Sequence, residues 1–198
     1  MSLLTQSLPK EAVIGGEHYP LNTDFRVGLR ILEAYEDQTL TPFERQVILL
    51  KMLYPSLPEK DEDLRQAVKL GVVFLNCGQV HTAPTGRRMY SFTRDAAHIY
   101  SGILHTHGVD LSCQQLHWWT FCAMFRELGQ DCVFTRLLAL RQRVLGGKLT
   151  TEERRAVAAL GEEALPPCEE SSPQCSKQIQ QFYDLLQNDV DKILGEEE

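Results

Sequence analysis

The sequence predicts a mainly α fold, a helical domain with a small N-terminal β-hairpin, and two observations indicate it. Gly15-Gly16 separates two short segments, 11–14 and 17–21, and a glycine pair readily takes the positive φ angles of a two-residue hairpin turn. From residue 24 onward, helix-start signals and apolar residues spaced by three and four recur along the chain. With 198 residues, 43% of them hydrophobic, the chain can bury the core of one domain that carries an appendage.

Capping signals define the best-marked helices. Thr41-Pro42-Phe43-Glu44 is a capping box with proline at the first helical position, and it predicts a helix that ends near Leu53. Ser112-x-x-Gln115 is a second such pattern, placed directly after the tight connection 109–111. So short a connection predicts that the helices on either side of it pack antiparallel.

The remaining elements follow from weaker local signals. Ser91 or Thr93 is expected to cap a helix that Gly108 ends. A further short strand near 80–92 would pair with the hairpin, since a lone two-stranded ribbon is marginally stable in water. Helices are also expected at about 24–35, 60–75, 133–144 and 151–160.

The chain is expected to have three parts. Residues 1–160 form the helical domain with its hairpin, and 161–175 form a linker rich in acidic residues and proline. Residues 176–198 then form an amphipathic helix that docks reversibly, because its apolar residues recur at spacings of three and four: Ile179, Phe182, Leu186, Val190 and Ile193.

The charge distribution argues against several function classes. Residues 161–198 hold ten acidic and two basic side chains, which leaves the other 160 residues nearly neutral within a net charge of −7. A nucleic-acid binder needs a basic face, so no nucleic-acid partner is expected. No apolar stretch approaches the ~20 residues of a membrane span, and no secretory signal is recognised, so we expect no membrane partner and a cytosolic protein.

No catalytic or cofactor-binding pattern is recognised. The six cysteines form no C-x-x-C pair, and the chain has no phosphate-binding glycine loop and no nucleophile elbow. His98, His105 and His107 cluster in sequence near Asp95 and Asp110, which leaves a histidine metal site in an enzyme as an unfavoured alternative. We therefore expect no enzyme, no metal and no cofactor.

The pair Trp118-Trp119 stands out within an aromatic helix. Adjacent helical positions point about 100° apart, so both indoles cannot face one narrow core. Trp119 fits the core stripe, whereas Trp118 faces either another element or a partner. The candidate partner-binding residues are those of this helix and of the last one: Trp118, Trp119, Phe121, Phe125, Phe182, Leu186, Val190 and Ile193.

Taken in order, these residues resemble the bacteriophage Gp-fifteen family. The resemblance covers about residues 10–160, and its most specific part is Leu116-His117-Trp118-Trp119 following Gly108-Val109-Asp110-Leu111. His107 stands where the family has an aromatic residue. The other matching segments are the hairpin, Asn22–Arg26, Tyr90–Phe92, Asp95, Ile99-Tyr100 and Phe121.

The resemblance implies a role in building the phage tail. Family members are encoded just before the tape-measure gene, a position typical of tail assembly chaperones, and this implies a factor in the host bacterial cytoplasm. Its implied partners are the tape-measure protein, bound by reversible hydrophobic contacts, and tail-tube subunits, with self-association also open. The alternative is a structural tail or connector component of the virion.

Overall fold

The computed structural model describes residues 5, 7–79, 88–147 and 149–167, and these form seven α-helices, one 3₁₀ helix and one two-stranded sheet. The mainly α fold with an N-terminal hairpin is thus confirmed. The chain separates into two compact units. Among the described residues, the first unit comprises 5, 7–79 and 115–122, and the second comprises 88–114, 123–147 and 149–167.

The first unit begins with the hairpin. Strands β1 (Glu11–Ile14) and β2 (Glu17–Pro20) pair antiparallel with Ile14 opposite Glu17. Gly15 and Gly16 take φ angles of 57° and 86°, the region that a two-residue turn with right-handed strand twist requires. Alternation along β1 buries Ala12 and Ile14, and this face of β1 packs on α3.

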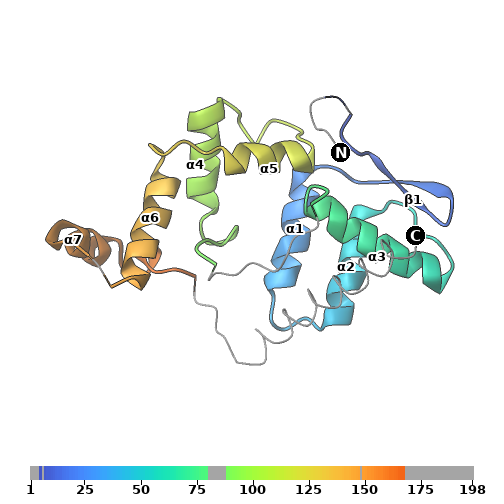
Figure 1. The fold of residues 1–198 in the computed structure, drawn as a ribbon, viewed down its shortest axis with the longest axis horizontal. Coiled ribbons are helices and arrows are strands. Elements are labelled where there is room, and N and C mark those ends of the chain that lie inside the picture. The colour runs from blue at the N-terminus through green and yellow to red at the C-terminus, as the bar shows by residue number, and fades with distance from the viewer. Residues whose placement is uncertain (1–4, 6, 80–87, 148, 168–198) are drawn as a thin grey trace, which may run out of the picture. The chain divides into compact units, whose positions relative to one another are not determined.

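Three helices complete the scaffold of the first unit: α1 (Phe25–Glu36), α2 (Pro42–Leu53) and α3 (Asp61–Leu75). The capping box at Thr41 is present, and the helix that it opens ends at Leu53 as predicted. Helix α2 packs on both α1 and α3 (Figure 1). A Cβ at Gly71 of α3 would lie 2.6 Å from Leu49 Cδ2, so the close approach of α2 and α3 depends on this glycine.

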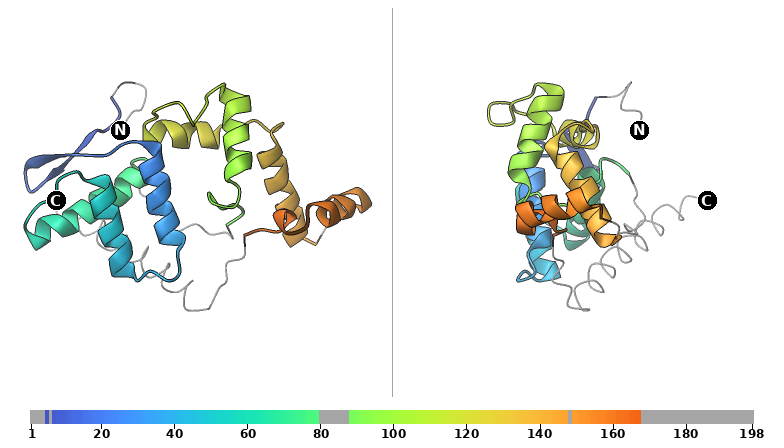
Figure 2. Two further views of the ribbon diagram at one scale, coloured as in Figure 1. Left: turned by 180° about the vertical axis from the view of Figure 1, so that it is seen from behind. Right: turned by 90° about the vertical axis from the view of Figure 1, so that its left-hand side faces the viewer.

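The second unit is built from α4 (Ala96–His107), α6 (Val133–Leu145), α7 (Thr151–Leu160) and the 3₁₀ helix η1 (Gly161–Ala164). Helix α5 (Trp118–Arg126) contributes residues 118–122 to the first unit and 123–126 to the second. Within the second unit, α6 packs on α4 and on η1, and α7 follows at the margin (Figure 2). No helix among the described residues is long and apolar enough to cross a bilayer.

The predicted helix start at Ser112 is wrong. The Ser112 hydroxyl donates to Asp110 Oδ1 at 2.6 Å, and α5 begins only at Trp118. Residues 116–118 instead pair with residues 23–25: the Phe25 N–H donates to the Leu116 carbonyl, and the Trp118 N–H donates to the Thr23 carbonyl, at 2.9 and 2.7 Å. This pairing keeps the backbone extended, so the connection between α4 and α5 is long and the predicted tight helical hairpin does not form.

The N-cap of α4 also differs from the prediction, because it is Asp95. The predicted strand near 80–92 falls partly on residues 80–87, which lie outside the described residues, and residues 88–92 form no strand. Residues 161–164, predicted to begin the linker, form η1 and bury Ala164 completely. Residues 168–198, with the rest of the linker and the predicted last helix, lie outside the described residues.

Candidate functional site

The two tryptophans lie in the core of the first unit. Trp118 is 2% exposed and Trp119 is 6% exposed. Their indole N–H groups donate to the carbonyls of Leu75 and Phe74, at 2.9 and 2.7 Å. These carbonyls belong to the last turn of α3, where carbonyl groups have no partner within the helix. The start of α5 therefore closes the C-terminal end of α3 with two indole hydrogen bonds.

Different neighbours cover the two indoles, which is why both are buried despite their different directions. A Cβ at Gly28 of α1 would lie 2.4 Å from Trp118 Cε3, so Trp118 lies directly on the backbone of α1. Trp119 reaches Gly78, just beyond α3. Phe121 stacks between Phe25 and Trp118, with ring centroids 5.1 and 5.7 Å away.

His117 positions this arrangement from outside the helix. Its Nδ1 accepts the Trp119 N–H at 3.1 Å, and its Nε2 therefore carries the hydrogen that is donated to the Pro9 carbonyl at 2.9 Å. Burial lowers the pKa of His117, and the charge of Lys10 lowers it further, against the effect of the Pro9 hydrogen bond. A neutral imidazole thus joins the residues before β1 to the start of α5.

Trp118, Trp119 and Phe121 were predicted to bind a partner, but their side chains are buried in the described structure. Phe125 lies half-buried in the second unit, where its ring packs against Tyr90, Phe92 and Phe134 at 5.2, 5.3 and 5.6 Å between centroids. In the described structure these four residues contribute to the cores, and their contact with a partner stays a prediction. The other four, Phe182, Leu186, Val190 and Ile193, lie outside the described residues.

A buried arginine organises the second unit. Arg141 of α6 is fully buried, and its guanidinium binds Asp95 through two parallel hydrogen bonds, Nη1 to Oδ2 at 2.8 Å and Nη2 to Oδ1 at 2.7 Å. Nε and Nη2 donate to the Glu163 carbonyl, and Nη1 donates to the Met89 carbonyl. All five N–H donors of the guanidinium therefore have acceptors, which a buried charge requires.

The acidic residues and histidines considered for a metal site are spread over other contacts. Asp95 binds Arg141, and Asp110 accepts from Ser112 and from the Tyr100 hydroxyl. His107 Nε2 lies 2.8 Å from the Met124 carbonyl. In the part of the chain that the structure describes, no three histidine, cysteine, aspartate or glutamate side chains come together as metal ligands would.

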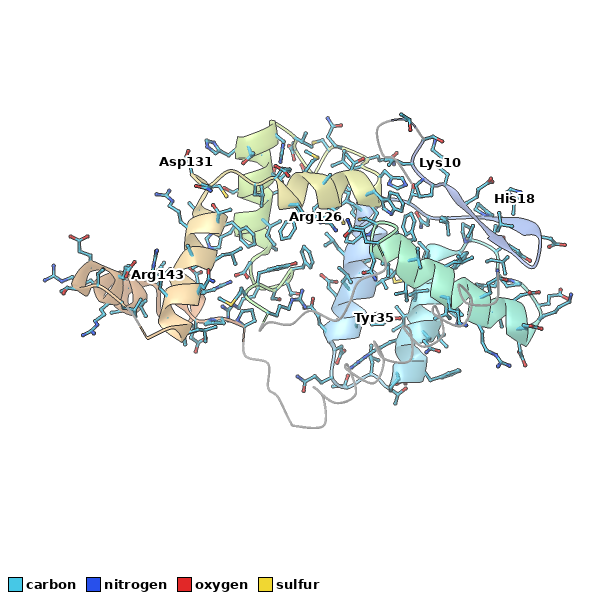
Figure 3. All side chains as sticks on the ribbon, in the orientation of Figure 1. Lys10, His18, Tyr35, Arg126, Asp131 and Arg143 are labelled. Carbon is cyan, nitrogen blue, oxygen red and sulfur yellow. The ribbon has the colours of Figure 1, made fainter. Side chains whose placement is uncertain are left out.

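The second unit exposes apolar side chains along its last elements. Helix α7 contains no buried residue, and Leu160 at its end is 41% exposed. Leu145, at the end of α6, and Leu165, just after η1, are similarly exposed. Local interactions hold α7 instead: the Thr150–Glu153 capping box and the ion pair from Arg143 Nε to Glu153 Oε1 at 2.7 Å (Arg143 is labelled in Figure 3).

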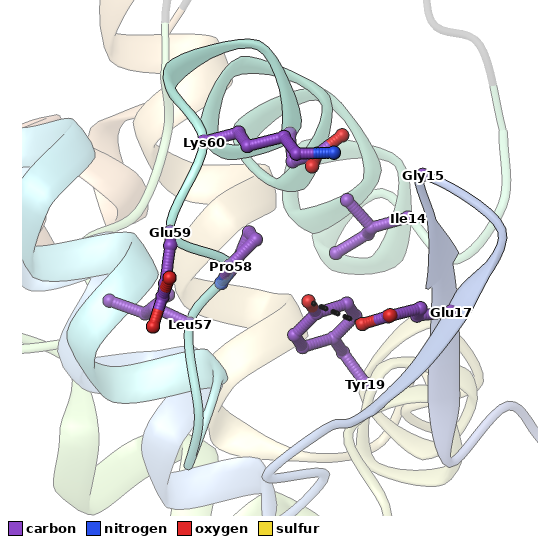
Figure 4. Close-up of a pocket in the computed structure, with 9 residues that line it drawn as sticks. Ile14, Gly15, Glu17, Tyr19, Leu57, Pro58, Glu59 and Lys60 are labelled. Carbon is purple, nitrogen blue, oxygen red and sulfur yellow. Dashed lines mark hydrogen bonds between the residues drawn. The ribbon is translucent and has the colours of Figure 1, made fainter.

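The first unit contains a surface pocket of about 380 Å³ between the hairpin and the loop that precedes α3 (Figure 4). Its lining includes Leu57 and Tyr19, which are partly accessible, and Ile14 and Pro58, which are buried. Polar side chains complete the lining: Glu17, Glu59, Lys60 and Asp63. The accessible surface of the pocket is therefore mainly polar, with three carboxylates and one ammonium group.

Sequence reasoning missed Arg141 and the pocket. Arg141 was visible as a charged residue in an apolar stripe, because it lies seven residues after Phe134 and four after Leu137, both buried on the same face of α6. The acidic run 59–63 suited the start of a helix, and α3 does begin there. Nothing in the sequence showed that the hairpin lies against this run.

Comparison with known proteins identifies a family but no individual relative. No curated protein and no solved structure matches the chain. The family described as Bacteriophage Gp15 protein matches residues 4–164, which include every element of both units and end at the last residue of η1. This match covers most of the chain. Membership of a phage protein family implies that the partners of this chain are virion-related proteins. The chain belongs to the bacteriophage Gp15 protein family and is a structural or morphogenesis protein of a phage.

Proposed function

We propose that this protein is a tail assembly chaperone that binds the tape-measure protein through reversible hydrophobic contacts and yields it to tail-tube subunits. It acts by binding alone and makes or breaks no covalent bond. The proposal rests on the phage family and on one structural observation, the apolar side chains that α7 and its neighbours leave exposed.

Helix α7 has the properties that reversible binding needs. A capping box, one ion pair and contacts with η1 hold it, and none of its residues is buried, so Leu160 stays exposed and Val157 is half-buried. Val157 and Leu160 lie three residues apart and share one face of the helix. A client helix that covers this face adds apolar burial to both partners, in the manner of a helix bound in a groove.

The strength of such contacts suits temporary holding. Each fully buried aliphatic side chain contributes ~1.5–3 kcal/mol, so a few of them give binding that a competing subunit can reverse. Leu145, Leu160 and Leu165 are each a little under half exposed, and the part of each side chain that is already covered adds nothing on binding. We therefore expect micromolar rather than nanomolar affinity.

Co-expression with a tape-measure protein from the same phage tests the proposal. We expect a complex that co-purifies and a larger soluble fraction of the tape-measure protein. L160K, which places a charge on the exposed apolar face of α7, should weaken the complex. A158K is the matched control, because it introduces the same residue about 160° away on the same exposed helix.

Two results would contradict the chaperone. One is the absence of any complex and of any gain in solubility. The other comes from mass spectrometry of purified phage particles, because a chaperone leaves before the virion is complete. Stoichiometric amounts of this chain in the particles would instead support the alternative, a structural tail or connector component.

A further inference from the structure

His117 occupies the N-cap position of α5. It directly precedes Trp118, the first residue of the helix, and its carbonyl accepts the Phe121 N–H at 3.0 Å, the first hydrogen bond of the helix. Its Nδ1 accepts the Trp119 N–H at 3.1 Å. The helix therefore begins with an imidazole, where serine, threonine, asparagine and aspartate are the usual caps. An imidazole differs from those side chains because it loses its acceptor when it binds a proton near neutral pH.

Two contacts fix the tautomer and the position of this imidazole. Nε2 lies 2.9 Å from the Pro9 carbonyl, which can only accept, so Nε2 carries the hydrogen and Nδ1 remains the acceptor. The ring packs edge-on against Phe74 and Trp119, with centroids 5.7 and 6.2 Å away. A proton that binds the neutral ring must therefore go to Nδ1, the atom that caps the helix.

The surroundings of His117 favour the neutral ring. Burial lowers its pKa, and the charge of Lys10 lowers it further, whereas the hydrogen bond to Pro9 raises it. The residue after Lys10, Glu11, binds His18 at 2.8 Å, and both of these side chains are exposed. The positive end of the α5 dipole also disfavours a cation at the N-cap. The cap is therefore present at neutral pH and is sensitive to acid.

The other elements in contact with His117 bring no counter-charge for an imidazolium. Asp24, the N-cap of α1, pairs with His117 through the backbone. Its carboxylate already accepts the Arg26 N–H at 2.8 Å and the Arg26 guanidinium at 3.2 Å. The last turn of α3 contributes Phe74, and α5 contributes Trp119, both uncharged. A proton on His117 is thus not compensated by a new ion pair.

We propose that His117 is an acid-sensitive cap of α5. Protonation places a hydrogen on Nδ1, so the Trp119 N–H then faces a second donor and loses its partner. The contact with Pro9 survives, because Nε2 keeps its hydrogen. The imidazolium therefore stays attached to the segment before β1 while the first turn of α5 loosens.

The loosened turn is the one that carries the two indoles. The Trp119 indole closes the end of α3 through the Phe74 carbonyl, and loss of the cap weakens this closure. Helix α5 also contributes residues to both units, so the cap acts on an element that both of them share. The exposed apolar face of α7 has no part in it, and this proposal does not depend on the chaperone role.

Hydrogen exchange of the full chain, followed by ¹H–¹⁵N NMR between about pH 7.5 and pH 5, tests the proposal. The protection factor of the Trp119 amide should fall by about fivefold or more as the His117 ring titrates, because this is the typical effect of losing one N-cap. The Trp118 amide is the internal control, since it donates to the Thr23 carbonyl at 2.7 Å. Its protection factor should change by less than about twofold.

Two variants assign the effect to His117. H117N keeps an oxygen acceptor at the N-cap but does not titrate, so its Trp119 amide should stay protected over the whole pH range. H18N removes the exposed histidine of the hairpin and should keep the wild-type dependence on pH. The wild-type titration decides by itself if H117N does not fold, because Trp118 and Trp119 are measured in one molecule. Constant protection of Trp119 in the wild type, an equal loss at Trp118, or a loss that persists in H117N would each overturn the proposal.

Discussion

Arg141 and Asp95 form a bidentate ion pair from which solvent is excluded: Arg141 is 0% exposed and Asp95 is 2% exposed. The pair joins the middle of α6 to the N-cap of α4, 46 residues apart in sequence. Through the Glu163 carbonyl, Arg141 also holds η1, and the Ser91 N–H donates to Asp95 Oδ2 at 3.0 Å. Four segments of the second unit therefore meet at one guanidinium–carboxylate pair.

R141M should destabilise the second unit by about 3–5 kcal/mol, because it leaves the Asp95 carboxylate buried without its counter-charge and removes the donors to two carbonyls. Urea unfolding followed by circular dichroism measures the change. R136M is the control, an exposed arginine on the same helix, and it should change the free energy of unfolding by less than about 0.5 kcal/mol. Equal effects of the two substitutions would show that the buried pair does not hold the unit.

The same pair makes stability depend on pH in the acid range. Burial by itself raises the pKa of Asp95, but the Arg141 and Ser91 hydrogen bonds and the charges of Arg141 and Arg94 together lower it. The unfolded state then binds the proton more readily, so this contribution is complete above about pH 5 and is lost as pH falls through the folded pKa. The wild type should lose stability more steeply below about pH 4 than D95N, whose side chain does not titrate. The free energy of unfolding is measured by urea unfolding of both proteins at a series of pH values. The same dependence on pH in the two proteins would contradict this prediction.

Local signals in the sequence predicted the elements that local interactions form. Thr41–Glu44 and Ser112–Gln115 carry the same capping pattern, yet only the first caps a helix. The second fails because the residues just after it pair with residues 23–25, a contact about 90 residues away along the chain. Capping patterns are local, so they cannot register competition from a distant strand-like pairing.

The partner of the buried Arg141 and the elements that cover the two tryptophans could not be predicted from the sequence for a related reason. Arg141 breaks the apolar stripe of α6 visibly, but its partner Asp95 could be any of many acidic residues. Helical angles correctly separated Trp118 from Trp119, and they could not show that α1 covers one indole while the end of α3 covers the other. The pocket likewise depends on where the hairpin lies against α3.

Gly28→Ala should destabilise the first unit by roughly 1–3 kcal/mol, because the new Cβ would lie 2.4 Å from Trp118 Cε3 and the indole would have to move. Tryptophan fluorescence during urea unfolding is the appropriate measurement, since both tryptophans lie in this unit. R30A provides the comparison at an exposed position of α1 and should be nearly neutral. A neutral Gly28→Ala would mean that Trp118 does not pack on the α1 backbone as described.

Two capping boxes separate local from global stability, because one begins a helix that packs into the core and the other begins a helix without buried residues. T41A should lower the free energy of unfolding by about 1 kcal/mol, because α2 buries Leu49, Leu50 and Leu53 and its start is part of a packed helix. T150A removes the same hydrogen bond from α7, which buries none of its residues. Its effect should stay local: hydrogen exchange speeds up at residues 151–160 while the unfolding midpoint moves little. If T150A lowered the midpoint as much as T41A, α7 would be part of the core, and its apolar face would not be available to a client.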